Sequence, residues 1–341
     1  MSTPVLSVRN LRVEFPTRRG TLVAVDDVSF DIAPGEVLGV VGESGAGKSM
    51  TGTAVIGLLE PPGHIAGGQV WLQGERIDTL PPEKMRRVRG KRIGMVFQDP
   101  LTSLNPLYRV GEQLIETIRT HTDASPAEAR KRSIGLLEAA GIQGAARRID
   151  SYPHEFSGGM RQRVVIALAL AAEPDLIIAD EPTTALDVSI QAQIIQLLKT
   201  LCRERGAAIM LITHDMGVIA ETADRVAVMY AGRIAEIGPV RDVVQRPQHP
   251  YTKGLMGSIP TLEMDGGRLL QIPGSMPRLT AIPKGCAFNP RCDFVFDRCR
   301  TERPNPMPSG ASAVACWLAD PKNGSPRVDR DATAAQAENP T

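Results

Sequence analysis

Gly42-Glu43-Ser44-Gly45-Ala46-Gly47-Lys48-Ser49 is a glycine-rich loop between a short apolar segment, Glu36–Val41, and a segment with helical spacing. It fits the P-loop pattern in the strand, loop and helix context that the pattern requires, which disfavours a simple glycine-rich turn. Glycines let a phosphate approach the backbone closely, so that loop N–H groups and the positive helix end can surround it. Lys48 adds a charge toward the β- and γ-phosphates, and the Ser49 hydroxyl is placed to bind Mg²⁺. The sequence therefore predicts that all the residues of this loop bind a nucleotide: Gly42, Glu43, Ser44, Gly45, Ala46, Gly47, Lys48 and Ser49.

A second apolar strand, Leu176–Ala179, is followed directly by two carboxylates, Asp180 and Glu181. Open α/β sheets place their ligand crevice at the carboxyl ends of the strands. We expect Asp180 to take part in the coordination shell of Mg²⁺. We expect Glu181 to orient or deprotonate the attacking water, because that role needs a carboxylate that lies beside the metal without being one of its ligands. Two acidic residues at a strand end are common on any surface, so this pair is informative only together with the P-loop.

The remaining pattern predicts an α/β fold around a parallel core. Alternating apolar residues in 11–15 and 23–32 predict antiparallel strands, and residues 71, 77 and 93–97 add further strand signal. From Asp99 to about Tyr152 the spacing becomes helical, which predicts an inserted helical subdomain. Strands and helices alternate again after residue 175, as in a parallel sheet covered by helices.

Phe156-Ser157-Gly158-Gly159-Met160-Arg161-Gln162 precedes a strongly apolar helix, with Ser157 placed as the N-cap and two glycines that leave the first N–H groups open to a phosphate. In this order and spacing, the motifs resemble those of the nucleotide-binding subunits of ABC transporters, whose signature loop this is. Phe156 and Met160 depart from the commonest Leu and Gln, as in the oligopeptide and dipeptide importers. The resemblance implies that three residues contact the γ-phosphate held by the opposite subunit of a dimer: Ser157, Gly158 and Gly159.

Further site residues follow from the same resemblance. Gln98, within residues 96–100, matches the Q-loop, whose amide senses Mg²⁺ and the γ-phosphate and hinges the helical subdomain. His214 matches the histidine that reaches the γ-phosphate from a strand end. Phe15 falls where the family places an adenine-stacking aromatic, although a half-buried strand residue explains it nearly as well. The implied catalytic residues are Glu181, His214 and Gln98, and the implied Mg²⁺ ligands are Ser49, Gln98 and Asp180.

The resemblance covers nearly everything from Leu6 to Trp317. It implies a nucleotide-binding domain at 1–240 with its helical subdomain at about 99–160, a C-terminal extension of the oligopeptide/dipeptide type at 241–320, and a flexible tail at 321–341. It implies an ATPase that binds ATP and Mg²⁺ and closes as a dimer with an identical or paralogous subunit. Two membrane permease subunits are expected to bind the surface near residues 98–108, where an exposed turn is expected and where changes at Leu104 or Arg109 are expected to uncouple transport. An extracytoplasmic binding protein is expected to deliver di- or oligopeptides.

Four of the five cysteines lie near the end of the chain, at Cys286, Cys292, Cys299 and Cys316. This clustering favours a ligand set over a disulfide framework. The first pair has five intervening residues, which is too wide for the usual zinc ribbon. Four thiolates can hold a [4Fe–4S] cluster. Because some peptide-importer ATPases carry one in this extension, the resemblance favours iron–sulfur over zinc.

Composition and charge exclude several other classes. The formal net charge is +1, so no global field draws the chain to nucleic acid or to anionic lipid, and 4% aromatic residues argue against a base-stacking platform. The basic run Lys84–Arg92 is expected to be a short helix with solvated charges. The longest apolar run, Val164–Ala172, is much shorter than the about twenty residues that cross a bilayer. With no signal-peptide pattern at the start, we expect a peripheral protein on the cytoplasmic face of the inner membrane.

Two alternatives stay open at this point. A nickel or glutathione importer would use the same ATPase residues. A soluble ABC ATPase acting on ribosomes or DNA would need twin cassettes or a long coiled-coil insertion, and the sequence shows neither pattern. A purely regulatory nucleotide-binding module is disfavoured because it is expected to lack a carboxylate at the position of Glu181.

Overall fold

An eight-stranded sheet forms the centre of the computed structural model, which describes residues 3–184, 186–258 and 271–323. Its strand order is β11-β12-β10-β9-β3-β8-β7-β6. The five strands from β9 to β6 are parallel: β3 (Val37–Val41), β6 (Ile93–Val96), β7 (Leu176–Asp180), β8 (Ala208–Ile212) and β9 (Arg225–Tyr230). Every residue of β3, β7 and β8 is buried, as expected for parallel strands with helices on both faces. The predicted parallel α/β core is confirmed.

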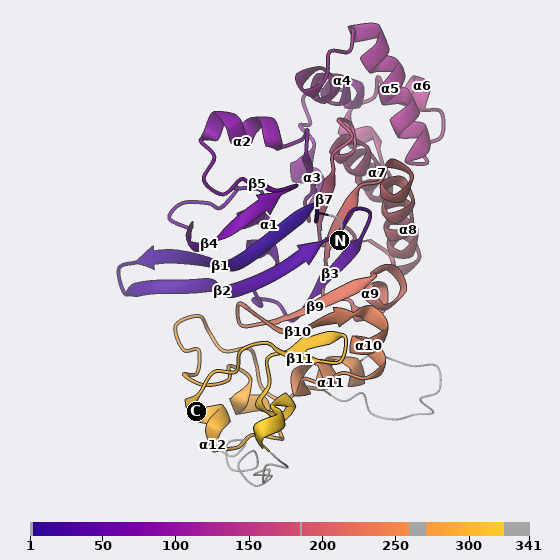
Figure 1. The fold of residues 1–341 in the computed structure, drawn as a ribbon. Helices are drawn as coiled ribbons and strands as arrows, with labels where there is room; N and C mark the ends of the chain where they lie inside the picture. The colour runs from indigo at the N-terminus through magenta and orange to yellow at the C-terminus, as the bar shows by residue number, and fades with distance from the viewer. Residues whose placement is uncertain (1–2, 185, 259–270, 324–341) are drawn as a thin grey trace.

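The C-terminal extension completes one edge of this sheet. β10 (Arg233–Pro239) runs antiparallel to β9 and pairs on its other side with β12 (Ser312–Val314), which in turn pairs with β11 (Met307–Ser309). Figure 1 shows the yellow hairpin labelled β11 along the edge of the sheet that β10 would otherwise form; its β12 strand is the one that pairs with β10. Gly238 allows this contact, because a Cβ there would lie 2.1 Å from the Ser312 Oγ. The sequence does not predict β11 and β12, since three residues are too few to show an alternation.

A smaller antiparallel sheet covers the N-terminal side of the core. Its order is β2-β1-β4-β5, formed by β1 (Leu6–Thr17), β2 (Gly20–Ile32), β4 (His64–Leu72) and β5 (Glu75–Arg76). The two long strands confirm the predicted antiparallel pair. Ile77, expected within a strand, lies one residue beyond β5 and is buried at 2% exposure. The sheet shares one apolar cluster with α1 (Lys48–Val55) and the core strands, so it is packed directly over the helix that follows the P-loop.

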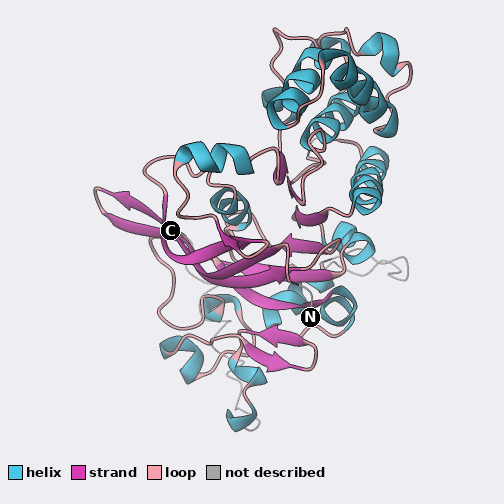
Figure 2. Ribbon diagram, turned by 45° about the horizontal axis from the view of Figure 1, so that its top comes forward, coloured by secondary structure: helices cyan, strands magenta, loops and turns pink. Residues whose placement is uncertain are grey.

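Helices without strands make up the insertion between β6 and β7. They are α3 (Pro100–Ser103), α4 (Val110–His121), α5 (Pro126–Ala139), α6 (Ala145–Arg148), the 3-10 turn η1 (Pro153–Glu155) and α7 (Gly158–Ala169). Figures 1 and 2 show α4, α5 and α6 standing apart from both sheets, which confirms the helical character predicted for this segment. The Ser125 side chain caps α5 by accepting a hydrogen bond from the Glu128 N–H at 3.3 Å. The basic run forms α2 (Pro82–Val88) and the turn after it, as expected.

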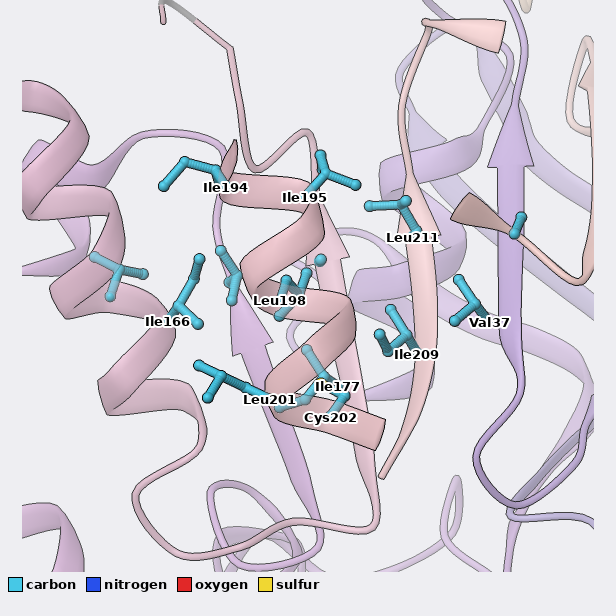
Figure 3. Close-up of a cluster of buried hydrophobic side chains, with 14 of the residues drawn as sticks. Val37, Ile166, Ile177, Ile194, Ile195, Leu198, Leu201, Cys202, Ile209 and Leu211 are labelled. Atoms are coloured by element: carbon cyan, nitrogen blue, oxygen red, sulfur yellow. The ribbon is translucent and has the colours of Figure 1, made fainter. Parts of the chain in front are cut away.

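The other helices cover the core sheet and the extension: α8 (Val188–Arg205), α9 (Met216–Thr222), α10 (Val240–Gln245), α11 (Pro250–Gly257) and α12 (Asp297–Thr301). One face of α8 is apolar and buried. Figure 3 shows Ile194, Leu198 and Leu201 of α8 directed between α7 and the strands β7 and β8. Cys202 is fully buried in this face, and burial raises the pKa of its thiol to about 12, so it packs as a small apolar residue. Within the ranges that the structure describes, no helix combines the length and the apolarity needed to span a bilayer.

Candidate nucleotide site

The P-loop runs from the end of β3 to the start of α1, as the sequence predicts. Two of its glycines are required by their surroundings. Gly42 has φ 152°, and a Cβ there would lie 2.2 Å from the Met229 carbonyl oxygen. Gly47 has φ 96° as the N-cap of α1, and its Cβ would lie 2.8 Å from the Ala24 carbonyl oxygen. A loop this close to its neighbours presents backbone N–H groups at a helix start, which is an anion-binding arrangement.

Lys48 lies inside the loop and is only 5% exposed. Its Nζ donates hydrogen bonds to the carbonyl oxygens of Gly42, at 2.9 Å, and Glu43, at 3.1 Å. Burial lowers the pKa of the ammonium group, while nearby carboxylates oppose that shift. The carbonyl groups of Gly42 and Glu43 therefore hold the ammonium group over the loop, where it can contact a phosphate oxygen.

Ser49 and Asp180 meet where α1 begins and β7 ends. The Ser49 Oγ donates a hydrogen bond to the Asp180 Oδ1 at 2.9 Å. Asp180 is 7% exposed, and burial raises the pKa of its carboxyl although the bond from Ser49 works in the other direction. A hydroxyl and a buried carboxylate oxygen are hard oxygen ligands of the kind that Mg²⁺ prefers, so these two residues fit the predicted metal.

Glu181 lies in contact with the other predicted catalytic side chains, Gln98 and His214. Its Oε2 accepts hydrogen bonds from the Gln98 Nε2 at 3.2 Å and the Thr184 Oγ1 at 3.0 Å, and it lies 3.5 Å from the His214 Nδ1. Glu181 has φ 44°, a left-handed conformation that costs a non-glycine residue roughly 1–3 kcal/mol. The ends of three core strands thus bring Gln98, Glu181 and His214 together.

These groups border a single cleft of about 590 Å³. Its walls are formed by the P-loop from Ser44 to Ser49 and by Gln98, Glu181 and His214. Three residues that the sequence did not indicate complete them: Ala24, Met50 and Leu279. Leu279 belongs to the C-terminal extension, so that segment reaches the nucleotide site. Its contribution could not be found from a local motif, because the residues that meet here are far apart in the chain.

Seven predicted nucleotide or Mg²⁺ residues do not line this cleft: Gly42, Glu43, Asp180, Phe15, Ser157, Gly158 and Gly159. Gly42 and Glu43 are linked to it through Lys48, and Asp180 is linked to it through Ser49. Phe15 is partly buried, with its ring beside Gly63, where an added Cβ would lie 2.4 Å from the ring. Ser157 is confirmed as the N-cap of α7, because its side chain accepts a hydrogen bond from the Met160 N–H at 3.4 Å. Gly158 and Gly159 form the first turn of the same helix, away from the cleft. In this chain alone, the signature loop and the P-loop are separate.

The four C-terminal cysteines are gathered around one small cavity of about 10 Å³. All are free thiols, and their side chains come from separate segments of the extension: Cys286, Cys292, Cys299 and Cys316. Burial raises the pKa of Cys286 and Cys292 to about 12 and that of Cys316 to about 11, so without a metal these groups are neutral thiols.

The structure gives no support to the predicted [4Fe–4S] cluster or zinc. Among the residues described, no group of three or more His, Cys, Asp or Glu is arranged to hold a metal ion. A cavity of about 10 Å³ holds about one water molecule, far less than an iron–sulfur cluster needs.

A loop of backbone donors at a helix start, a buried lysine, a serine–aspartate oxygen pair and a carboxylate on the next strand define a P-loop nucleoside triphosphatase. Comparison with known proteins narrows this class. Residues 25–184 match the family described as ABC transporter, and residues 235–299 match the C-terminal region of oligopeptide/dipeptide transporters.

Curated relatives align along most of the chain. The dipeptide transport ATP-binding protein DppD of Bacillus subtilis is 49% identical over 93% of this chain and 95% of its own length. The oligopeptide transport ATP-binding protein OppD of Salmonella typhimurium is 50% identical over 92% of this chain and 93% of its own length. The chain therefore belongs to the ATP-binding subunits of ABC transporters, in the oligopeptide/dipeptide family, and it is an ATPase that uses ATP and Mg²⁺.

Solved structures agree with this assignment. The dimeric, post-hydrolysis ATP-binding cassette MJ0796 bound to ADP and Pi has a TM-score of 0.62 and 29% identity, covering 69% of this chain and 99% of that one. The cbiO1 protein of Clostridium perfringens, part of the ABC transporter complex cbiONQ, has a TM-score of 0.61 and 30% identity over 72% of this chain and 92% of that one. The shared part corresponds to the ABC ATPase fold.

Proposed function

We propose that this ATPase energises the import of dipeptides or oligopeptides across a membrane. The observation that carries the proposal is the near full-length alignment with DppD and OppD, which includes the C-terminal region as well as the ATPase core. A nickel or glutathione importer stays the alternative, because the residues of the ATP site do not contact the transported molecule. We retain the division into 1–240, 241–320 and a tail at 321–341, of which residues 324–341 lie outside the described part of the chain.

The proposed site roles follow the contacts in the cleft. The P-loop N–H groups and Lys48 would hold the β- and γ-phosphates, and Ser49, Asp180 and Gln98 would hold Mg²⁺. Bound Mg²⁺ would offset negative charge on the phosphates. Glu181 accepts the proton of the attacking water, and Gln98, Thr184 and His214 fix its carboxylate at distances of 3.0–3.5 Å. Phe15 is proposed to meet the adenine from β1.

A second ATPase subunit, identical or paralogous, is proposed to complete the site. Ser157, Gly158 and Gly159 begin α7 and do not reach the cleft of their own chain. A helix start with free N–H groups can bind a phosphate presented by a partner. The dimeric MJ0796 structures that resemble this chain support such an arrangement.

Permease docking is proposed for the turn between α3 and α4, with one correction to the sequence prediction. Leu104 was expected on an exposed turn, but it is 3% exposed because it packs into the core cluster of the helical subdomain. The exposed apolar residues of this segment are Leu107, at 81%, and Tyr108, at 55%. We propose that they contact two membrane permease subunits at the cytoplasmic face, fed by an extracytoplasmic peptide-binding protein.

Leu107→Glu is expected to abolish peptide uptake while basal ATPase activity stays within about twofold of the unmodified protein. A buried carboxylate at an apolar contact costs more than the roughly 2 kcal/mol typical of an interface hot spot, whereas Leu107 does not line the cleft. Uptake of labelled dipeptide by cells and ATP hydrolysis by purified protein are compared. Lys131→Glu, on an exposed position of α5, is the matched control that should leave both unchanged. Equal loss of both activities in Leu107→Glu would show a folding defect instead, and full uptake would remove this docking site.

A metal at the four cysteines is kept as a separate proposal, with [4Fe–4S] preferred to zinc. Its support is that four free thiols from one extension border the same cavity. Anaerobic purification followed by iron, sulfide and zinc analysis tests the proposal: about four iron and four sulfide per chain would support it and would require the cavity of about 10 Å³ to open around the cluster. A colourless protein with neither metal, and with all four thiols reactive in the native state, would end the proposal.

A further inference from the structure

The P-loop is tied to the C-terminal extension at Glu43. Arg291, at the end of the 3-10 turn η2 (Asn289–Arg291), places its Nη1 3.0 Å from both oxygens of the Glu43 carboxylate. The Arg291 side chain is 7% exposed and that of Glu43 is 29% exposed. A charge pair this well shielded from water is screened little by salt, so it is a specific link between residues that are 248 positions apart.

Arg291 cannot follow Glu43 if the loop moves, because its other donors are already engaged. Its Nε donates to the Pro273 carbonyl oxygen at 2.8 Å, and its Nη2 lies 3.4 Å from the carbonyl oxygens of Ile272 and Gly274. The guanidinium also lies over the rings of Tyr230 and Phe288, at 5.8 and 5.9 Å from their centroids. These contacts make Arg291 a fixed anchor.

Glu43 also contacts the P-loop groups that are placed to bind the phosphates. Its N–H donates to the Tyr251 hydroxyl at 2.9 Å, so both its side chain and its backbone are bound by residues outside the loop. Its carbonyl oxygen accepts hydrogen bonds from the Lys48 Nζ and from the Ala46 N–H, each at 3.1 Å. The position of Glu43 therefore sets both the first turn of the P-loop and the position of the lysine.

We infer that Arg291 is a positioning residue for ATP binding, through which the C-terminal extension holds the P-loop in its phosphate-binding conformation. This inference rests on the proposed role of the P-loop. A loop fixed before the ligand arrives loses less conformational freedom on binding, and the affinity rises accordingly. Arg291 touches neither the water nor the groups around Glu181, so it affects nucleotide affinity and not the chemical step.

The test separates KM from kcat. Arg291→Met is expected to raise both the KM and the dissociation constant for MgATP about 10-fold, within the 5- to 150-fold range of typical coupling between sites, with kcat within about twofold. Arg291→Lys keeps one charge but not the fork of donors, so it should give a smaller increase. Arg298→Met is the matched control, because Arg298 pairs with Glu302 and Asp320 inside the extension, and its KM should not change.

Glu43→Gln keeps the inference testable if Arg291→Met does not fold, because Glu43 lies on a partly exposed loop. It should raise KM similarly, and Arg291→Met should add little in the Glu43→Gln background, since the two residues act through one contact. If Arg291→Lys and Glu43→Gln leave the KM for MgATP unchanged and lower only the melting temperature, the pair stabilises the fold without affecting nucleotide binding. That result would overturn the inference. If the unmodified protein fails to bind MgATP, or binds it as well after Lys48→Ala, the proposed P-loop role itself fails.

Discussion

Glu181→Gln is expected to retain MgATP while its turnover falls by about 10²- to 10⁴-fold, the usual contribution of a general base. Glutamine keeps the size of the side chain and one oxygen that can accept the bonds from Gln98 and Thr184. It cannot take a proton from water at neutral pH. Because binding survives and hydrolysis does not, an ATP-bound dimer should accumulate.

Steady-state ATP hydrolysis and light scattering in the presence of MgATP measure the two parts of this result. Glu173→Gln is the matched control, since Glu173 pairs with Arg132 outside the cleft and its loss should not alter turnover. Turnover near that of the unmodified protein in Glu181→Gln would assign the base to another group. Loss of ATP binding would show that the carboxylate holds the metal or the loop instead.

Lys48→Ala is expected to weaken MgATP binding by about 30- to 5,000-fold, which corresponds to the roughly 2–5 kcal/mol lost when one partner of a buried charged pair is removed. The lysine is 5% exposed and lies within the loop, so no other cation can take its place without rearrangement. Removing it also leaves the carbonyl oxygens of Gly42 and Glu43 without this donor.

Direct titration with a fluorescent ATP analogue measures this affinity independently of the chemical step. Lys84→Ala, at an exposed position of α2, is the control and should bind as tightly as the unmodified protein. An unchanged dissociation constant with slow turnover would move Lys48 from nucleotide binding to catalysis.

Much of the ATPase core could be predicted from short stretches of sequence. The P-loop and the strands before it could be predicted because their signals lie within a few consecutive residues: glycines where φ is positive, and fully apolar runs where a parallel strand is buried. Only Glu181 was predicted from its place at a strand end; Gln98 and His214 were added by the resemblance to ABC transporters. Parallel strands bring their carboxyl ends to one edge, which is why the three side chains can meet. The 3.0–3.5 Å contacts at Glu181 are consistent with that expectation.

Contacts made by distant segments could not be predicted. Leu104 stands between prolines that indicate a turn, and only the packing of the helical subdomain shows that it is buried. The pairing of Arg291 with Glu43 follows from no motif, because Glu43 occupies a position of the P-loop pattern that any residue can take and Arg291 lies outside every nucleotide-binding motif. Clustering of the four cysteines was foreseen, but their spacing in the chain does not determine the size of the cavity between them.

The pairing of β12 with β10 has a consequence for how this chain can be shortened. A fragment ending at residue 240 would leave β10 as an open edge strand, which invites edge-to-edge association with other chains. It would also remove the backbone N–H groups of Gln248 and His249, which donate to the fully buried carboxylate of Glu236 at 2.9 and 3.0 Å. We therefore expect a fragment that ends at residue 240 to aggregate more readily than the full chain, because it exposes a strand edge and takes away the two donors that pair with Glu236.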